Sequence, residues 1–163
     1  MARQLWIMRH AKAAAEIPGH LDFDRPLTKK GLSQAAWMAE YIADLRGETP
    51  PAWVLHSSAL RTTQTAAVSF PGATLVPDVG LYTGDIDLCI ASLEQQATDH
   101  EIVALVGHNP TVHALAAWLS GDEALVTSRF SPSTLCVLNA DVASWAALGP
   151  ASCQVLSLVS APR

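Results

Sequence analysis

The sequence predicts an α/β fold, a three-layer α/β/α sandwich in which helices cover both faces of a largely parallel sheet. Two observations lead to this fold class. Short apolar runs of strand length alternate along the chain with longer segments of helical periodicity, which is the pattern of a sheet built through helical crossovers. The chain also has 163 residues, of which 50% are hydrophobic and 15% are charged. This is enough apolar material for one core, so we expect a single domain over residues 1–163.

The first predicted strand and helix are separated by a polar connection. Residues 5–8 form an apolar run that ends at Arg9. Thr28 is a typical N-cap residue, and apolar side chains recur at helical spacing after it as far as Ala43. The sequence therefore predicts a strand, a loop and a long helix in this order.

The middle of the chain repeats the alternation. Residues 53–56 are predicted as the second strand, residues 59–70 as a helix and residues 73–76 as the third strand. The preceding stretch 47–52 contains two consecutive prolines and is predicted as a loop within the domain. A further helix is expected over residues 86–97.

The last third of the chain contains the clearest strand. Residues 102–106 are apolar throughout and are bounded by Glu101 and Gly107, which is typical of a strand buried on both faces. Residues 110–119 follow as a helix with proline in its first turn. Two late strands are predicted over residues 134–138 and 155–159.

Composition argues against two classes of partner. The chain has 10 basic and 15 acidic residues and a formal net charge of −5, so we expect no nucleic-acid partner, which would need a basic surface. No segment is apolar for long enough to span a bilayer, and the first residues lack the pattern of a signal peptide, so no membrane partner is expected. The three cysteines are widely spaced and odd in number, which is typical of reduced thiols in a cytoplasmic protein.

Cationic side chains follow three of the predicted strands. Arg9 and His10 come directly after the first strand, Arg61 lies just beyond the second, and His108 follows the strand over residues 102–106. Ligands of such sheets bind outside the carboxyl ends of the strands. An arginine binds phosphate oxygens through two parallel hydrogen bonds, and an imidazole can act as a nucleophile. The pattern therefore indicates a site for phosphoryl transfer.

Four segments together resemble the histidine phosphatase superfamily. They are MRHAKA at residues 8–13, RPLTKKG at 25–31, SSALRTTQTA at 57–66 and VGHNPTV at 106–112. Each segment alone is a weak signal, whereas their order and spacing over most of the chain are specific. They are most similar to the SixA-type phosphohistidine phosphatases, a small branch of the superfamily. The resemblance implies a phosphoglycerate mutase-like fold, and the short connection from Arg61 to His108 predicts that it lacks a large cap insertion.

The resemblance also implies a role for each residue of the motifs. His10 would be the nucleophile that accepts the phosphoryl group, and Arg9 and Arg61 would bind the phosphoryl oxygens. His108 would contact the phosphoryl group and stabilise charge in the transition state. Ala11 stands where the usual motif of the superfamily has glycine. No metal or other cofactor is expected, because arginines supply the positive charge that Mg²⁺ supplies in other phosphoryl transfers.

Four further residues are candidates for the site. Arg25 is expected either to bind substrate or to hold the loop after the first strand, and Ser57 either to donate a hydrogen bond to phosphate or to complete a turn. A leaving alcohol needs a general acid, for which Asp85 and Asp87 are the candidates. Neither aspartate lies in a motif that identifies it as the acid. A leaving imidazole needs a proton donor much less than a leaving alcohol does, so the lack of an identified acid favours cleavage of a P–N bond.

We therefore interpret the sequence as that of a metal-independent phosphatase, which acts on phosphohistidine in a phosphorylated carrier protein. A phosphatase of the same superfamily that takes small phosphoesters is the first alternative. A phosphate-binding module without turnover is the second. The spacing of His108 and His113 is poor for metal ligands on one helix face, and no carboxylate or cysteine completes a set, so no metal site is expected.

Overall fold

The computed structural model describes residues 2–163. A six-stranded sheet forms the middle layer, with the order β3-β2-β4-β1-β5-β6. The strands are β1 (Arg3–Arg9), β2 (Trp53–Ser57), β3 (Thr74–Asp78), β4 (Ile102–Gly107), β5 (Thr134–Ala140) and β6 (Cys153–Ser160). The pairs β1–β4, β2–β4 and β2–β3 are parallel, whereas β1–β5 and β5–β6 are antiparallel. The sheet is thus largely parallel, which confirms the predicted fold class.

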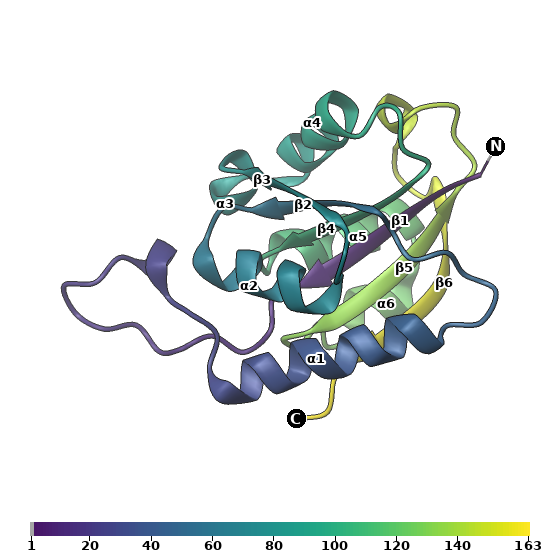
Figure 1. The fold of residues 1–163 in the computed structure, drawn as a ribbon. Helices are drawn as coiled ribbons and strands as arrows, with labels where there is room; N and C mark the ends of the chain where they lie inside the picture. Colours follow the sequence, from purple (N-terminus) through teal and green to yellow (C-terminus); the bar gives the residue numbers. More distant parts are fainter. Residues whose placement is uncertain (1) are drawn as a thin grey trace.

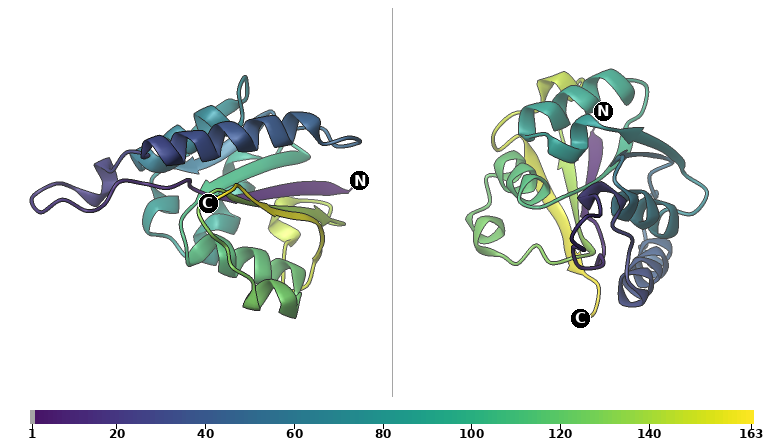
Figure 2. Two further views of the ribbon diagram at one scale, coloured as in Figure 1. Left: turned by 90° about the horizontal axis from the view of Figure 1, so that it is seen from below. Right: turned by 90° about the vertical axis from the view of Figure 1, so that its left-hand side faces the viewer.

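Helices cover both faces of this sheet (Figure 1). They are α1 (Lys29–Asp44), α2 (Leu60–Ser69), α3 (Gly80–Thr83), α4 (Ile86–Gln96), α5 (Thr111–Ser120) and α6 (Glu123–Thr127). The left view of Figure 2 shows the sheet between α1 on one side and α5 and α6 on the other. Within residues 2–163, no helix is both long and apolar enough to cross a membrane.

The alternation of side chains along β1 divides the core into two parts. Leu5 and Ile7 pack in one cluster with residues of α4 and α5. Trp6 and Met8 point to the opposite face and pack with residues of α1 and α2, among them Met38. All four β1 side chains are fully buried, because successive residues of a central strand point to opposite faces and both faces are covered by helices.

The predicted elements are present, and the structure adds some short ones. The six strands and the four longer helices all lie where the sequence predicts them, within a few residues at their ends. The helices α3 and α6, with four and five residues, were not predicted, because one turn has no measurable periodicity. Pro110 is the N-cap of α5 rather than its first helical residue. Cys89, Cys136 and Cys153 are buried and unpaired, as expected.

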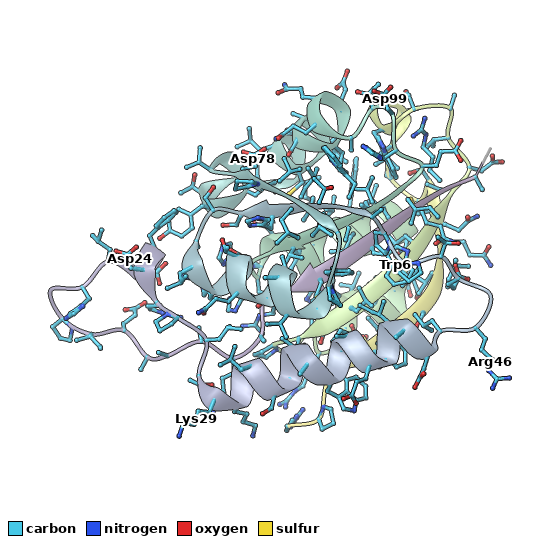
Figure 3. The ribbon with its side chains drawn as sticks, in the orientation of Figure 1. Trp6, Asp24, Lys29, Arg46, Asp78 and Asp99 are labelled. Carbon is cyan, nitrogen blue, oxygen red and sulfur yellow. The ribbon has the colours of Figure 1, made fainter. Side chains whose placement is uncertain are left out.

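A long connection between β1 and α1 projects from the carboxyl ends of β1, β2 and β4 (Figure 1). It contains a 3₁₀ turn over Asp22–Asp24. Asp24 lies on the projecting part, and Lys29 lies where α1 begins (Figure 3). The N-cap residue Thr28 accepts a hydrogen bond from Gly31 N at 3.0 Å, and its own backbone N–H donates to Lys12 O at 2.9 Å. These bonds attach the start of α1 to the backbone just beyond β1.

Candidate active site

The site begins at the carboxyl ends of three neighbouring strands. In the register of the sheet, Arg9 at the end of β1 lies beside Gly107 at the end of β4, and His56 of β2 lies beside Val106. Residues just after these positions therefore meet at one edge. The imidazole rings of His10 and His108 lie 5.2 Å apart between centroids, at an interplanar angle of 61°.

Backbone hydrogen bonds fix His10 from both sides and determine its tautomer. Its N–H donates to Gly107 O at 3.0 Å, and its carbonyl accepts from Ser133 N at 3.1 Å. The ring Nδ1 lies 2.7 Å from Ala11 O. Because a carbonyl only accepts hydrogen bonds, Nδ1 must carry the proton. The lone pair of His10 Nε2 is therefore available for attack.

Both imidazoles are neutral at neutral pH. The pKa of His10 is lowered to about 4, mainly by burial and also by the nearby charges of Arg61, Arg9 and Arg25, while the bond to Ala11 opposes the shift. Burial likewise lowers the pKa of His108 to about 3, with Arg61 as the next cause. A neutral imidazole is the form that can attack phosphorus.

Ser57 holds the second imidazole. His108 Nε2 lies 2.8 Å from Ser57 Oγ, and Ser57 Oγ also accepts a hydrogen bond from Ala59 N at 3.3 Å. Ser57 is fully buried, and within residues 2–163 His108 Nε2 is the only acceptor for its hydroxyl proton, so we assign the proton to this hydrogen bond. His108 Nδ1 then carries the ring proton and can donate it. Ser57 thus contacts His108 and takes part in a turn as well, and its predicted contact with phosphate stays a prediction.

The guanidinium of Arg9 is held through a carbonyl of a distant loop. Arg9 Nη1 donates to Phe130 O at 3.0 Å, and Asn109 Nδ2 donates to the same oxygen at 2.8 Å. Phe130 is itself buried and stacks on His113. One backbone carbonyl therefore positions polar side chains from the ends of both β1 and β4.

Arg61 is bound by the projecting loop. Its Nη1 donates to Asp22 O at 2.8 Å and its Nη2 to Asp22 Oδ2 at 3.0 Å. Arg25 Nη1 forms ion pairs with Asp22 Oδ1 at 3.1 Å and with Glu16 Oε1 at 3.4 Å. Of the two roles expected for Arg25, the attachment of this loop is therefore visible in the structure, and substrate binding stays a prediction.

Asp22 and Tyr82 also belong to this network, although no motif in the sequence predicts them as site residues. Tyr82 Oη donates to Asp22 Oδ2 at 2.7 Å across 60 positions of the chain, and its ring lies 5.7 Å from that of His108. The hydrogen bond from Tyr82 lowers the pKa of Asp22, and the hydrogen bond from Arg61 lowers it further, against the effect of burial. Asp22 is therefore ionised. Only the folding of the loop brings these residues together, so no local motif could have revealed them.

The remaining predicted carboxylates lie elsewhere. Asp85 is the N-cap of α4, where its Oδ1 accepts from Leu88 N at 3.2 Å. Asp87 is exposed in the first turn of the same helix. Among the hydrogen bonds and ion pairs of the described residues, neither carboxylate contacts His10 or His108. Their role as a general acid stays a prediction.

Unpartnered polar atoms are concentrated at this edge of the sheet. Within residues 2–163, the buried side-chain polar atoms without a hydrogen-bond partner are Arg9 Nε, Arg25 Nε, Arg61 Nε, His108 Nδ1 and Asn109 Oδ1. Buried polar groups without partners are rare and call for an explanation such as a ligand. Three of the five are N–H groups of cationic guanidinium groups, so the ligand they fit is an anion. Among the described residues 2–163, no group of three or more His, Cys, Asp or Glu side chains is arranged to hold a metal ion.

Comparisons with known proteins agree with this chemistry. A family model described as histidine phosphatase superfamily (branch 1) matches residues 5–79. An uncharacterized protein of Mycobacterium tuberculosis strain H37Rv is 33% identical over 164 residues, which are 96% of this chain and 100% of that protein.

Solved structures show the same likeness. A chain from Nakamurella multipartitia, assigned as a phosphohistidine phosphatase SixA, is 30% identical and has a TM-score of 0.84, covering 100% of this chain and 98% of that one. The protein histidine phosphatase SixA complexed with tungstate is 26% identical with a TM-score of 0.76, and the match covers 96% of each chain. The mycobacterial glucosyl-3-phosphoglycerate phosphatase is 16% identical with a TM-score of 0.65 and shares the fold.

Proposed function

The chain belongs to the histidine phosphatase superfamily, in its SixA-type branch, and from this we propose that it hydrolyses phosphohistidine on a protein. The observation that carries the proposal is the set of unpartnered guanidinium N–H groups beside two neutral imidazoles. Such a site attracts a phosphoryl dianion and offers it a nucleophile. It also contains its own positive charge, so the proposed reaction uses no metal ion.

In the first step, His10 Nε2 attacks the phosphorus atom of the substrate. A bond forms between this nitrogen and phosphorus, while the P–N bond of the substrate breaks. A phosphohistidine whose other ring nitrogen is protonated leaves as neutral imidazole, so no further proton has to be supplied. His10 keeps the proton on Nδ1, where Ala11 O at 2.7 Å accepts its hydrogen bond and stabilises the new positive charge.

Arginines and the second histidine stabilise the transferred group. The Nε–H groups of Arg9 and Arg61 are buried without partners, and we assign them to the phosphoryl oxygens. His108 donates from Nδ1, because Ser57 occupies its Nε2. Donors that are fixed before the reaction stabilise developing charge without reorganisation, which is the main contribution to such catalysis.

In the second step, water attacks the phosphohistidine intermediate. A P–O bond forms, the bond from phosphorus to His10 Nε2 breaks, and both protons of the water leave with the product as dihydrogen phosphate. His10 is then neutral again, with its proton on Nδ1. The atoms and charges of both steps therefore balance without a general acid.

The state of Asp22 favours a P–N bond over an ester. This carboxylate contacts Arg61 and Tyr82, and its lowered pKa keeps it ionised. An ionised carboxylate cannot give a proton to a leaving alkoxide, whereas a leaving imidazole does not need one. The predicted acids Asp85 and Asp87 form no hydrogen bond or ion pair with either imidazole among the described residues.

The test compares a phosphohistidine peptide with a phosphoserine peptide of the same sequence, in the presence of a metal chelator. We expect hydrolysis of the phosphohistidine peptide in preference to the phosphoserine peptide, with no effect of the chelator. His10→Asn should lower kcat by roughly 10³-fold or more, as the loss of a nucleophile does in other enzymes. His20→Asn, a substitution of an exposed histidine on the projecting loop, is the matched control.

Each other outcome contradicts part of the proposal. A preference for phosphoserine would assign the protein to the phosphoesterases and direct attention to Asp85 and Asp87. Activity that survives in His10→Asn, or that the chelator abolishes, would contradict the mechanism. Tight binding of phosphate without turnover of either peptide would indicate a binding module.

A further inference from the structure

A basic groove lies next to the proposed active site. We use this name for the cavity of about 530 Å³ whose charged lining residues are Arg9, Lys12, Lys30, Arg129 and Arg163. The chain has only 10 lysines and arginines and a net charge of −5, yet half of its cations line this one groove. No acidic residue is among its lining residues.

Four segments of the chain build the groove, and hydrogen bonds hold them together. The segments are the end of β1 with the residues after it, the first turns of α1, the loop before β5 and the residues after β6. Gln34, which also lines the groove, is buried; its Oε1 accepts from Lys12 N at 3.0 Å, and its Nε2 donates to Pro162 O at 3.4 Å. Figure 1 shows the end of the chain beside α1. The groove is thus a fixed part of the fold.

The charges of the groove are not neutralised by the protein. Within residues 2–163, every ion pair with a nitrogen–oxygen distance up to 4.0 Å involves Arg25 or Arg61. The first turn of α1, which brings Lys30 to the groove, contains no acidic residue, although the positive end of a helix dipole favours carboxylates there. Grouped cations without counter-charges attract an anionic partner.

We propose that the basic groove binds an acidic segment of the phosphoprotein, next to its phosphohistidine; this rests on the proposed function. Arg9 connects the basic groove to the proposed active site, because it lines the groove and is followed directly by His10. Lys12, Lys30, Arg129 and Arg163 are exposed, so each forms only a weak, screened ion pair. Several must act together, which requires a polyvalent acidic stretch and selects substrates by charge near the phosphorylated residue.

The experiment compares two phosphohistidine peptides with the same central sequence. One carries glutamates on both sides of the phosphohistidine, and the other carries glutamines at the same positions. The measured quantity is the ratio of their kcat/KM values at low ionic strength. We expect the wild-type protein to prefer the acidic peptide roughly 5-fold, through a lower KM, and to lose this preference in 0.5 M salt.

Two double variants with equal charge change separate the groove from general electrostatics. Lys30→Gln with Arg129→Gln removes two cations of the groove, and the ratio should fall to about 1 or 2. Lys29→Gln with Arg46→Gln removes two exposed cations outside the groove, and the ratio should stay near that of the wild type. All four side chains are exposed, so both double variants should fold.

The remaining outcomes overturn the inference. Equal ratios in the two double variants, or no preference in the wild type, would contradict a docking groove. A third outcome combines inhibition by inorganic pyrophosphate, weakened only in the groove variant, with equal kcat/KM for the two peptides. It would show that the groove binds a small polyanion and not an acidic segment of a protein. If the protein hydrolyses only phosphoserine peptides, the proposed specificity fails, and the same flanking residues on those peptides still test the groove.

Discussion

Ser57 determines which nitrogen of His108 carries the proton. Its hydroxyl lies 2.8 Å from Nε2, while the backbone N–H of Ala59 occupies an acceptor position on the same oxygen. Within residues 2–163 this buried hydroxyl has no acceptor other than His108 Nε2, so we assign its proton to His108. A histidine tautomer is set by the partner of the other ring nitrogen, so this buried serine acts as a positioning residue.

Ser57→Ala should therefore weaken catalysis through His108. Without the hydroxyl, the proton of His108 is no longer fixed at Nδ1, and we expect kcat to fall roughly 10²-fold, the lower end of the loss when one fixed donor is removed from a transition-state site. Nitrogen chemical shifts of the His108 ring should show a change of tautomer. Ser58→Ala, at the neighbouring position, is the control. A loss of kcat with an unchanged His108 tautomer would contradict the assignment.

Some residues of the candidate site can be predicted from the sequence, and others cannot. Arg9, His10, Arg61 and His108 can be predicted from the sequence as site residues, because they lie at the ends of β1, β2 and β4 or within four residues of them, and these ends are easy to locate. Asp22 could not be found in this way. Its contacts with Arg61 and Tyr82 span 39 and 60 positions and depend on how the projecting loop folds back.

At the scale of elements, the start of α1 packs so closely on the backbone after β1 that it leaves no room for a side chain at Gly31. A Cβ atom added at Gly31 would overlap the carbonyl oxygen of Lys12, and Gly31 is buried. The glycine in the RPLTKKG segment thus serves close packing between the first turn of the helix and the backbone after β1. The contact brings together the two segments that contribute Lys12 and Lys30 to the lining of the basic groove.

Gly31→Ala should lower stability although alanine favours helices. The gain in helix propensity is about 1 kcal/mol, whereas an overpacked contact with backbone typically costs roughly 1–3 kcal/mol and shifts the helix. We expect a net decrease in the free energy of unfolding measured in urea. Ser33→Ala, at an exposed position of the same helix, should change it by less than about 0.5 kcal/mol. A Gly31→Ala protein more stable than the wild type would show that α1 has space to move.

The long elements were predictable for a physical reason that the short ones lack. Helix α1 has 16 residues and a side-chain N-cap at Thr28, and β4 is apolar along its length. By contrast, α3 and the 3₁₀ turn at Asp22–Asp24 are shorter than two helical turns. Their conformations depend on tertiary contacts such as the hydrogen bond between Tyr82 and Asp22.

For the whole molecule, the buried histidines make stability depend on pH. His10 has a pKa of about 4 in the folded protein and about 6.5 when unfolded. Below pH 6.5 the unfolded chain binds a proton that the folded chain does not, so stability is full above this pH and falls as the pH drops toward 4. The loss from His10 alone is on the order of 3 kcal/mol.

This dependence can be measured by urea unfolding at pH 7 and at pH 4.5. The wild-type protein should lose stability over this interval, and His10→Asn should lose less, because asparagine does not titrate. His20→Asn, at an exposed position, should follow the wild type. An equal loss in His10→Asn and the wild type would show that other groups cause the acid sensitivity.

The backbone of His10 is bonded to β4 through Gly107 and to the turn before β5 through Ser133. Both bonds lie directly at the ends of the central strands β1, β4 and β5, which in a cooperative fold separate only when the core opens. Neither of these bonds involves the projecting loop. In the proposed reaction, the residue that carries the covalent phosphoryl group is therefore held on backbone that is as durable as the core of the protein itself.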